Sequence, residues 1–88
     1  MKPDEARRLA RDIVENGILD FSGHALDEMA NDELHTTDCL NIVRAGVYST
    51  PEYEKGELRY RVQTARICVV VTFESDTRIR VVTAWRKK

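Results

Sequence analysis

His24 and Glu28 form a pair of side chains that could act together as a base and its support. Residues four positions apart lie on the same side of a helix, so the carboxylate could hold the imidazole in one tautomer and orientation. An imidazole held in this way can serve as a general base. There is a competing interpretation for each residue. A lone histidine near a helix start is more often structural, and Glu28 can belong to an ordinary solvated helix face. The other histidine, His35, lies in a polar turn and is assigned no role.

A second group of candidates consists of arginines that alternate with apolar residues in the C-terminal part of the chain: Arg59, Arg61, Arg80 and Arg86. Alternation places such residues on one face of a sheet. A guanidinium remains charged at physiological pH and matches phosphate oxygens, so this face is a candidate phosphate-binding surface. The competing interpretation is that the arginines prevent pairing and aggregation of the strands. The neighbouring aromatic residues Tyr60 and Trp85 are expected in the core.

A histidine base and an arginine in one site could cleave RNA through its own 2′-hydroxyl group. The base would remove the 2′-proton, and the guanidinium would stabilise the charge of the phosphorane. The departing oxygen would need a proton donor, for which Tyr60, Thr83 and a water molecule are candidates. We expect no metal ion and no other cofactor, because the sequence has neither zinc-ligand spacing nor a glycine-rich phosphate loop.

The composition indicates one folded domain that covers residues 1–88. The chain has 88 residues, of which 42% are hydrophobic and 33% are charged, a balance typical of a globular protein. The longest apolar run, Ile67–Val71, is too short to cross a membrane, and the N-terminus lacks an apolar signal region. We therefore expect a cytoplasmic protein without membrane contact. Cys39 and Cys68 are interpreted as reduced, buried thiols.

The net charge of −1 conceals an uneven distribution. Residues 1–56 contain six Lys and Arg against twelve Asp and Glu, giving −6, whereas residues 57–88 contain eight against three, giving +5. The C-terminal half is therefore the one expected to attract an anion.

The elements that must position these residues follow from the periodicity of apolar residues. We predict an α+β fold in which two to three helices, within about residues 3–46, pack on one face of an antiparallel meander of three to four strands, about residues 47–86. The first helix should run from Pro3 to about Asn16. Ser22 should cap the second helix, and Thr36 or Thr37 the third.

The strand pattern divides the predicted sheet into two faces. Leu58, Tyr60 and Val62 should face the helices, as should Ile79 and Val81, and the arginines should lie on the other face. Thr83 and Trp85 continue the alternation of Ile79 and Val81. The run at residues 67–73 is apolar on both faces and should form the central strand.

Four segments carry a resemblance to a known family: Phe21-Ser22-Gly23-His24-Ala25 followed by Met29, Asp38-Cys39-x-Asn41-x-Val43-x-x-Gly46, Tyr60-Arg61-Val62, and Val81-Val82-Thr83-Ala84-Trp85. Their order and spacing resemble a bacterial domain-of-unknown-function family, DUF 4258, over roughly residues 20–86. That family is similar in architecture to the RelE and MqsR type of messenger-RNA-cleaving toxins. The resemblance implies a RelE-like toxin fold whose exposed sheet face carries a ribonuclease site.

The resemblance also implies roles for individual residues. His24, Arg61 and Thr83 match the family's helix histidine, strand arginine and last-strand threonine, and are the expected catalytic residues. To these we add four expected substrate-binding residues, Arg59, Tyr60, Arg80 and Arg86, and Glu28 as the residue that orients His24. The sequence departs from the family at Glu28 and at Asn31-Asp32-Glu33, where relatives tend to carry arginines, which weakens the expected contact of the helix with RNA.

The predicted function is accordingly a RelE/MqsR-like endoribonuclease toxin of a bacterial toxin–antitoxin pair, which cleaves RNA without a metal ion. Its expected partners are RNA, either free or on the ribosome, and a cognate antitoxin protein. The alternative is a non-catalytic module that binds a protein or a nucleic acid through the basic sheet face.

Overall fold

The computed structural model describes residues 1–87, and its elements confirm the predicted α+β class. Three helices occur, α1 (Pro3–Asn16), α2 (Gly23–Asn31) and α3 (Thr36–Ala45). Six strands occur, β1 (Ile18–Phe21), β2 (Val47–Tyr48), β3 (Glu52–Glu54), β4 (Glu57–Gln63), β5 (Ile67–Ser75) and β6 (Arg78–Arg86). No helix within residues 1–87 combines the length and the apolar character that crossing a membrane requires.

The helices begin where the sequence places capping groups, with one shift. The predicted bounds of α1 are confirmed, with Pro3 in its first turn. Ser22 caps α2 as predicted, because its side chain accepts a hydrogen bond of 3.0 Å from the Ala25 N–H. The prediction that Thr36 or Thr37 caps α3 is wrong. His35 is the capping residue, and its backbone N–H donates to the Asp38 carboxylate over 2.9 Å.

The sheet is larger than predicted and is mixed rather than antiparallel. Its strand order is β1-β6-β5-β4-β2, and β3 also pairs with β4. The strand that the sequence did not predict, β1, lies parallel to β6, with Ile18 opposite Arg78 and Phe21 opposite Val81. The remaining pairs are antiparallel. The prediction of three to four antiparallel strands is therefore corrected by a parallel edge strand and a short hairpin.

The hairpin between β3 and β4 turns through Lys55 and Gly56. Both residues have positive φ, 51° and 79°, as the two central residues of a type I′ turn require. Such a turn matches the twist of the flanking strands, and Glu54 consequently pairs with Glu57. The hairpin brings two acidic residues of β3, Glu52 and Glu54, beside β4.

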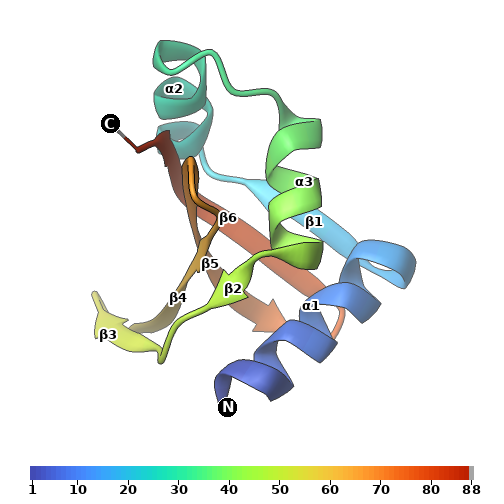
Figure 1. The fold of residues 1–88 in the computed structure, drawn as a ribbon. Coiled ribbons are helices and arrows are strands. Elements are labelled where there is room, and N and C mark those ends of the chain that lie inside the picture. Colours follow the sequence, from blue (N-terminus) through green and yellow to red (C-terminus); the bar gives the residue numbers. More distant parts are fainter. Residues whose placement is uncertain (88) are drawn as a thin grey trace.

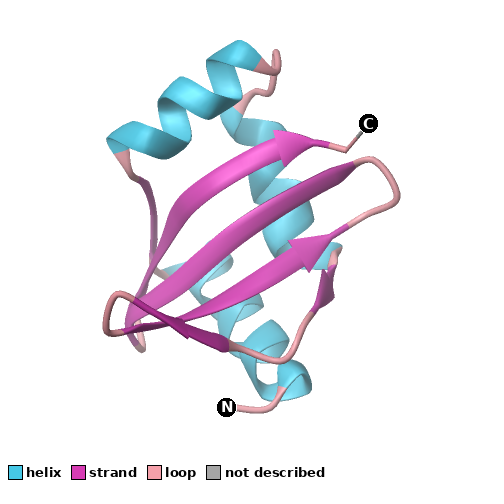
Figure 2. Ribbon diagram, turned by 90° about the vertical axis from the view of Figure 1, so that its left-hand side faces the viewer, coloured by secondary structure: helices cyan, strands magenta, loops and turns pink. Residues whose placement is uncertain are grey.

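The helices lie in two places around the sheet (Figure 1). α1 and α3 cover one face, where they bury a core that includes Ile13, Val43, Tyr60, Val69 and Val81. α2 instead runs along the edge of the sheet beside β6, beyond the end of β1, and Figure 2 shows it next to the strand that leads to the C-terminus. The face of β4, β5 and β6 that is turned toward the viewer in Figure 2 carries no helix. We call it the open face.

A β-bulge in β6 decides which of its side chains reach the open face. Val70 pairs with Thr83 but Val71 pairs with Val81, so that Val82 has no partner in β5. The extra residue reverses the alternation: Val81 and Ala84 are both fully buried on the helix side. Thr83 and Trp85 therefore lie on the open face, which corrects the prediction that they continue the core side of the strand.

Candidate functional site

A cavity of about 570 Å³ lies on the open face between β4, β6, the β3–β4 hairpin and the start of α2. It brings together most of the predicted site residues. His24 from α2, Arg59 and Arg61 from β4, and Arg80 and Thr83 from β6 all line it. The three expected catalytic residues thus share one cavity, although they come from segments up to 59 positions apart in the sequence.

The strand register arranges the cavity residues in rows that cross the sheet. Arg61, Val70 and Thr83 form one row, because Val70 pairs with each of the other two. Adjacent strands are about 4.8 Å apart, so the backbones of Arg61 and Thr83 are separated by roughly 10 Å. Val70, which is 8% exposed, lies beneath the space between them. In the next row, Thr72 lies between Arg59 and Arg80.

Two of the cavity arginines are engaged in ion pairs. Arg59 contacts Glu57 at 3.2 Å and Glu54 at 3.4 Å, and its guanidinium side chain is only 17% exposed. Arg80 contacts Glu57 at 2.8 Å and Glu74 at 3.3 Å. The three carboxylates carry a larger formal charge than these two guanidinium groups, which are therefore fully compensated. Arg59 and Arg80 therefore shape the cavity more than they attract an anion to it.

Arg61 differs from its neighbours because it has no carboxylate partner among residues 1–87. Its side chain is exposed and lines the cavity. Lys55, at the tip of the hairpin, also lines the cavity and also lacks an ion-pair partner within the described part of the chain. Arg61 and Lys55 are thus the cations that an incoming anion meets without displacing a carboxylate.

His24 is positioned by the first turn of α2. Ser22 holds this turn, because its hydroxyl accepts from the Ala25 N–H and donates to the Val82 carbonyl of the bulge over 2.9 Å. The His24 side chain is 67% exposed, so it is accessible to a ligand. Its Nε2 lies 3.9 Å from Oε1 of Glu28, which is beyond hydrogen-bond range. Glu28 is therefore next to the imidazole, as predicted, without a direct bond that orients it.

Tyr60 is a predicted substrate-binding residue that lies away from this cavity. Because it alternates with Arg59 and Arg61 along β4, it points to the helix side, where it is 1% exposed. Its ring packs edge-on against Phe73 at 5.5 Å, and its hydroxyl donates to the Met1 carbonyl at 3.2 Å. Burial raises the pKa of the Tyr60 hydroxyl, and nearby Glu5 adds to this shift. The Tyr60 side chain is thus part of the core between the sheet and the helices.

Arg86 is the other predicted binding residue that does not line the cavity. The bulge at Val82 turns it away from the open face, toward the end of α2. There its Nε donates to the Asp32 carbonyl at 2.8 Å, and its guanidinium also contacts the Glu33 carbonyl at 3.2 Å. Its backbone N–H donates to the Asp32 carboxylate. Arg86 consequently fastens the C-terminal end of α2 to β6.

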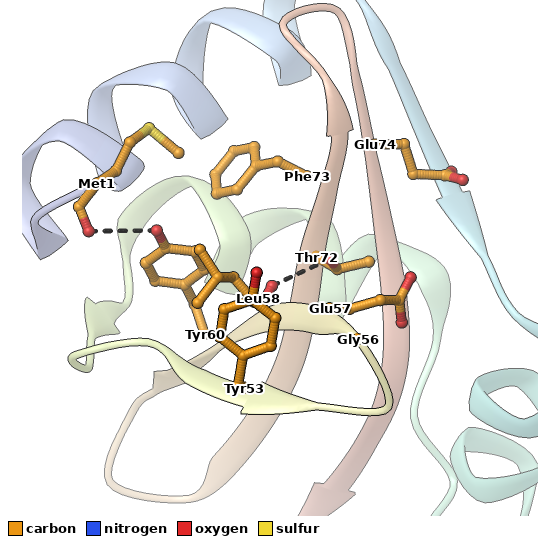
Figure 3. A pocket seen from close by; sticks show the side chains of 9 residues that line it. All are labelled: Met1, Tyr53, Gly56, Glu57, Leu58, Tyr60, Thr72, Phe73 and Glu74. Carbon is orange, nitrogen blue, oxygen red and sulfur yellow. Dashed lines mark hydrogen bonds between the residues drawn. The ribbon is translucent and has the colours of Figure 1, made fainter.

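A second cavity, of about 520 Å³, lies beside the β3–β4 hairpin at the end of the sheet (Figure 3). Apolar side chains line part of it, Met1, Tyr53, Leu58 and Phe73 among them, and the carboxylates of Glu57 and Glu74 line another part. No lysine or arginine among the described residues lines this cavity. Its chemistry does not match a phosphate, so the cavity that contains Arg61 is the better candidate.

Both cysteines are buried and unpaired, as predicted. Burial raises the pKa of the Cys39 thiol to about 11, with a further contribution from Asp38, and it raises the pKa of the Cys68 thiol as well. Cys68 lies under the open face, opposite Gln63 and Trp85. At physiological pH both thiols stay protonated, which is unfavourable for a nucleophile.

Seven cavity residues were not predicted as site residues: Ser22, Glu52, Glu54, Lys55, Val70, Val82 and Trp85. Ser22 was recognised only as a helix cap. Lys55 could have been found from Lys55-Gly56, since a residue pair of this kind between two strands indicates a hairpin tip. Trp85 could not have been found from alternation, because the bulge that exposes it leaves no mark in the spacing.

The sequence was also compared with known proteins. The family model described as a domain of unknown function (DUF4258) matches residues 21–86, which are 66 of the 88 residues. No curated protein and no solved structure matches the chain. The matched range begins at the end of β1 and contains every residue of the cavity.

Proposed function

The chain belongs to the DUF4258 family, and from this premise we propose that it is an endoribonuclease, the RNA-cleaving toxin of a bacterial toxin–antitoxin pair. The observation that carries the proposal is the shared cavity of His24, Arg61 and Thr83. It combines an accessible imidazole, a guanidinium without a carboxylate partner in residues 1–87 and a hydroxyl group. The cover of one sheet face by α1 and α3 and the uncovered opposite face support a RelE/MqsR-like arrangement, in which the site occupies the uncovered face.

In the proposed reaction the RNA supplies its own nucleophile. The imidazole of His24 accepts the proton of the 2′-hydroxyl, and the 2′-oxygen attacks the adjacent phosphorus. The bond from phosphorus to the 5′-oxygen of the next nucleotide then breaks. The products are a 2′,3′-cyclic phosphate and a 5′-hydroxyl end.

Arg61 and Thr83 act on the phosphate in this scheme. The phosphorane carries more negative charge on its equatorial oxygens than the ground state does, and the guanidinium of Arg61 can stabilise this added charge. The Thr83 hydroxyl, across the sheet in the same row, donates a hydrogen bond to the same group. The departing 5′-oxygen takes its proton from water, since the Tyr60 hydroxyl is buried on the opposite side of the sheet.

A binding module without hydrolysis is the second candidate function, and one observation favours it. Arg59 and Arg80 are already paired with Glu54, Glu57 and Glu74, which reduces the attraction of this face for a polyanion. In this alternative the open face docks a partner protein, and His24 has no chemical role. A cleavage assay separates the two candidates.

The test incubates purified protein with a single-stranded RNA oligonucleotide in the presence of EDTA. The proposal expects fragments that end in a 2′,3′-cyclic phosphate, and no cleavage of the same sequence with 2′-O-methyl groups. His24→Ala and Arg61→Gln should each lower the cleavage rate by roughly 100-fold or more, since each removes a group that acts in the transition state. Thr83→Val should lower it less, because a single neutral hydrogen bond is lost.

Matched controls lie outside the cavity. His35→Ala and Arg66→Gln make the same chemical changes at exposed positions that do not line the cavity, and they should cleave like the wild type. Circular dichroism checks that the variants retain the fold. Expression in a bacterial host should arrest growth for the wild type and not for His24→Ala. Wild-type protein that leaves the RNA intact in every condition would instead support the binding module.

A further inference from the structure

Trp85 is an aromatic cavity residue to which the proposed reaction assigns no role. Without the bulge at Val82, it would follow Ile79 and Val81 into the core. With the bulge it lies on the open face, partly exposed, and forms part of the wall of the cavity. A large apolar ring at the surface of a binding cavity is available for contact with a ligand.

The surroundings of the ring favour a flat, aromatic ligand. Trp85 in β6 lies opposite Cys68 in β5, and Cys68 is only 2% exposed. The indole N–H, a hydrogen-bond donor, has no partner among residues 1–87. Other polar groups of the face are engaged, as in the hydrogen bond from the Thr72 hydroxyl to the Leu58 carbonyl. The cavity therefore offers an indole with an unused donor, and the cationic side chain of Arg61 lines the same cavity.

The separation between Trp85 and the proposed phosphate-binding residues is similar to the separation between the base and the phosphate of a nucleotide. Thr83 and Trp85 are two residues apart on the same face of β6, so their backbones are roughly 6.6 Å apart. A base stacked against Trp85 would leave the phosphate of its own or the adjacent nucleotide within reach of Arg61 and Thr83. A duplex cannot engage in this way, because its bases are stacked and paired inside the helix.

We propose that Trp85 is a stacking platform for an unpaired nucleobase, and that the cavity therefore takes single-stranded RNA and discriminates against duplex. This inference rests on the proposed function for the identity of the ligand, since stacking is a means by which proteins bind unpaired bases of any sequence. Trp85 is in this role a binding residue, and it leaves the chemical step to His24, Arg61 and Thr83.

The first test uses the fact that Trp85 is the one tryptophan of the chain, so that its fluorescence reports this site alone. Wild-type protein is titrated with a single-stranded RNA that carries 2′-O-methyl groups and cannot be cleaved. The inference expects quenching of the fluorescence by this ligand. An abasic oligonucleotide with the same number of phosphates, and a duplex of the same sequence, should quench little. Equal quenching by the abasic ligand would overturn the inference.

The second test measures the affinity of variants for the same labelled oligonucleotide by fluorescence anisotropy. Trp85→Leu removes the aromatic face and should weaken binding by roughly 5-fold to 150-fold, whereas Trp85→Phe should retain much of the affinity. The matched control is Tyr53→Leu, since Tyr53 is an aromatic residue that is 75% exposed and lines the other cavity. Its affinity should equal that of the wild type. If Trp85→Leu does not fold, the fluorescence titration of the wild type still decides whether a base stacks on Trp85.

The two tests separate this inference from the proposed reaction. Cleavage of RNA that is indifferent to Trp85→Leu would overturn the stacking role and leave the endoribonuclease in place. Binding of uncleavable RNA that depends on Trp85, without cleavage of ordinary RNA, would retain the stacking role and remove the endoribonuclease.

Discussion

Arg59 and Arg61 show how two residues of one type on one strand face can differ in their environment. Both alternate with buried residues in β4 and both line the cavity. Arg59 is held by Glu54 and Glu57, and one of its nitrogens, Nε, is buried without a hydrogen-bond partner in the described residues. Arg61 has neither carboxylate. The sequence predicts a basic face but not this difference, because it depends on which carboxylates the hairpin and β6 bring alongside.

The position of Tyr60 leads to a prediction for a single hydroxyl. Tyr60→Phe should leave RNA cleavage unchanged, because the phenol lies on the helix side of the sheet. Loss of its hydrogen bond to the Met1 carbonyl should lower the free energy of unfolding by about 1 kcal/mol. Urea unfolding and the cleavage assay measure the two effects. A large loss of cleavage at unchanged stability would place Tyr60 in the reaction.

At the scale of elements, local signals predicted the helices well and the edges of the sheet poorly. α1 has a proline and two acidic residues in its first turn and an apolar stripe, and its predicted bounds are confirmed. β1 consists of Ile-Leu-Asp-Phe, which shows no strand alternation. It is a strand because it pairs with residues 78–81, some 60 positions later, and a local pattern cannot reveal such a pairing.

The candidate site was predictable to a similar degree. His24 and the arginines of β4 followed from helix and strand periodicity, since those elements are regular. The residues alone make Thr83 one of three candidate proton donors, and only the family resemblance implies its catalytic role, because simple alternation places it in the core. The bulge at Val82 decides on which face of the sheet Thr83 and Trp85 lie. It arises from the register between β5 and β6 rather than from a residue type.

The junction of α1 and β1 permits a prediction with a matched control. A Cβ atom at Gly17 would lie 2.3 Å from the Thr77 carbonyl oxygen, to which the Ile18 N–H donates as β1 begins. Gly17→Ala should therefore push β1 away from β6 and lower the free energy of unfolding by roughly 1–3 kcal/mol. A Cβ atom at Gly23 meets nothing within 4 Å, so Gly23→Ala should be neutral or slightly stabilising. Urea unfolding of both variants checks this, and equal stability of the two would contradict it.

At the scale of the whole molecule, the positive charge that the open face presents is smaller than the sequence suggests. Residues 57–88 have a net charge of +5, but Glu57 and Glu74 lie in the same part of the chain, and the hairpin adds Glu52 and Glu54 at the cavity. Arg61 and Lys55 are left as cavity cations without a carboxylate partner within residues 1–87. The positive charge without a carboxylate partner on the open face is thus concentrated at Arg61 and Lys55, rather than spread over a uniformly basic surface.

This count predicts a weak salt dependence. For single strands the slope of log affinity against log salt concentration is about −0.7 per neutralised phosphate, so two contacts give about −1.4. The affinity for the uncleavable RNA should then fall about sevenfold between 50 and 200 mM salt. Anisotropy titrations at several salt concentrations measure the slope. A slope steeper than about −4 would mean that paired arginines such as Arg80 exchange their carboxylates for phosphates.

The buried cysteine thiols and tyrosine hydroxyls predict a loss of stability at alkaline pH. The Cys39 thiol has a pKa of about 11 in the folded chain against 9.0 as its ordinary value, and burial also raises the pKa values of Cys68, Tyr48 and Tyr60. The unfolded chain loses these protons at a lower pH than the folded chain. These groups should therefore leave the stability unchanged below about pH 9 and lower it above that pH, by up to about 3 kcal/mol for Cys39 alone by about pH 11.

Urea unfolding with a reductant, at about pH 7.5 and about pH 10.5, measures this decline. Cys39→Ala should show a smaller decline than the wild type, because Cys68 and the two tyrosines still contribute. Equal declines in the two proteins would mean that the Cys39 thiol does not take part.

The hydrogen bonds that hold the start of α2 to β6 have a consequence for the order in which the structure forms during synthesis. Helix α2 has a few anchors on the sheet, and two of them, the hydrogen bonds to the carbonyls of Val81 and Val82, involve the last strand. A nascent chain that has emerged only as far as β5 thus contains His24 and Arg61 but lacks the strand that holds the helix beside them. Assembly of the cavity therefore waits for β6, because this strand supplies Thr83 and Trp85 as well as the carbonyl groups that hold the start of α2.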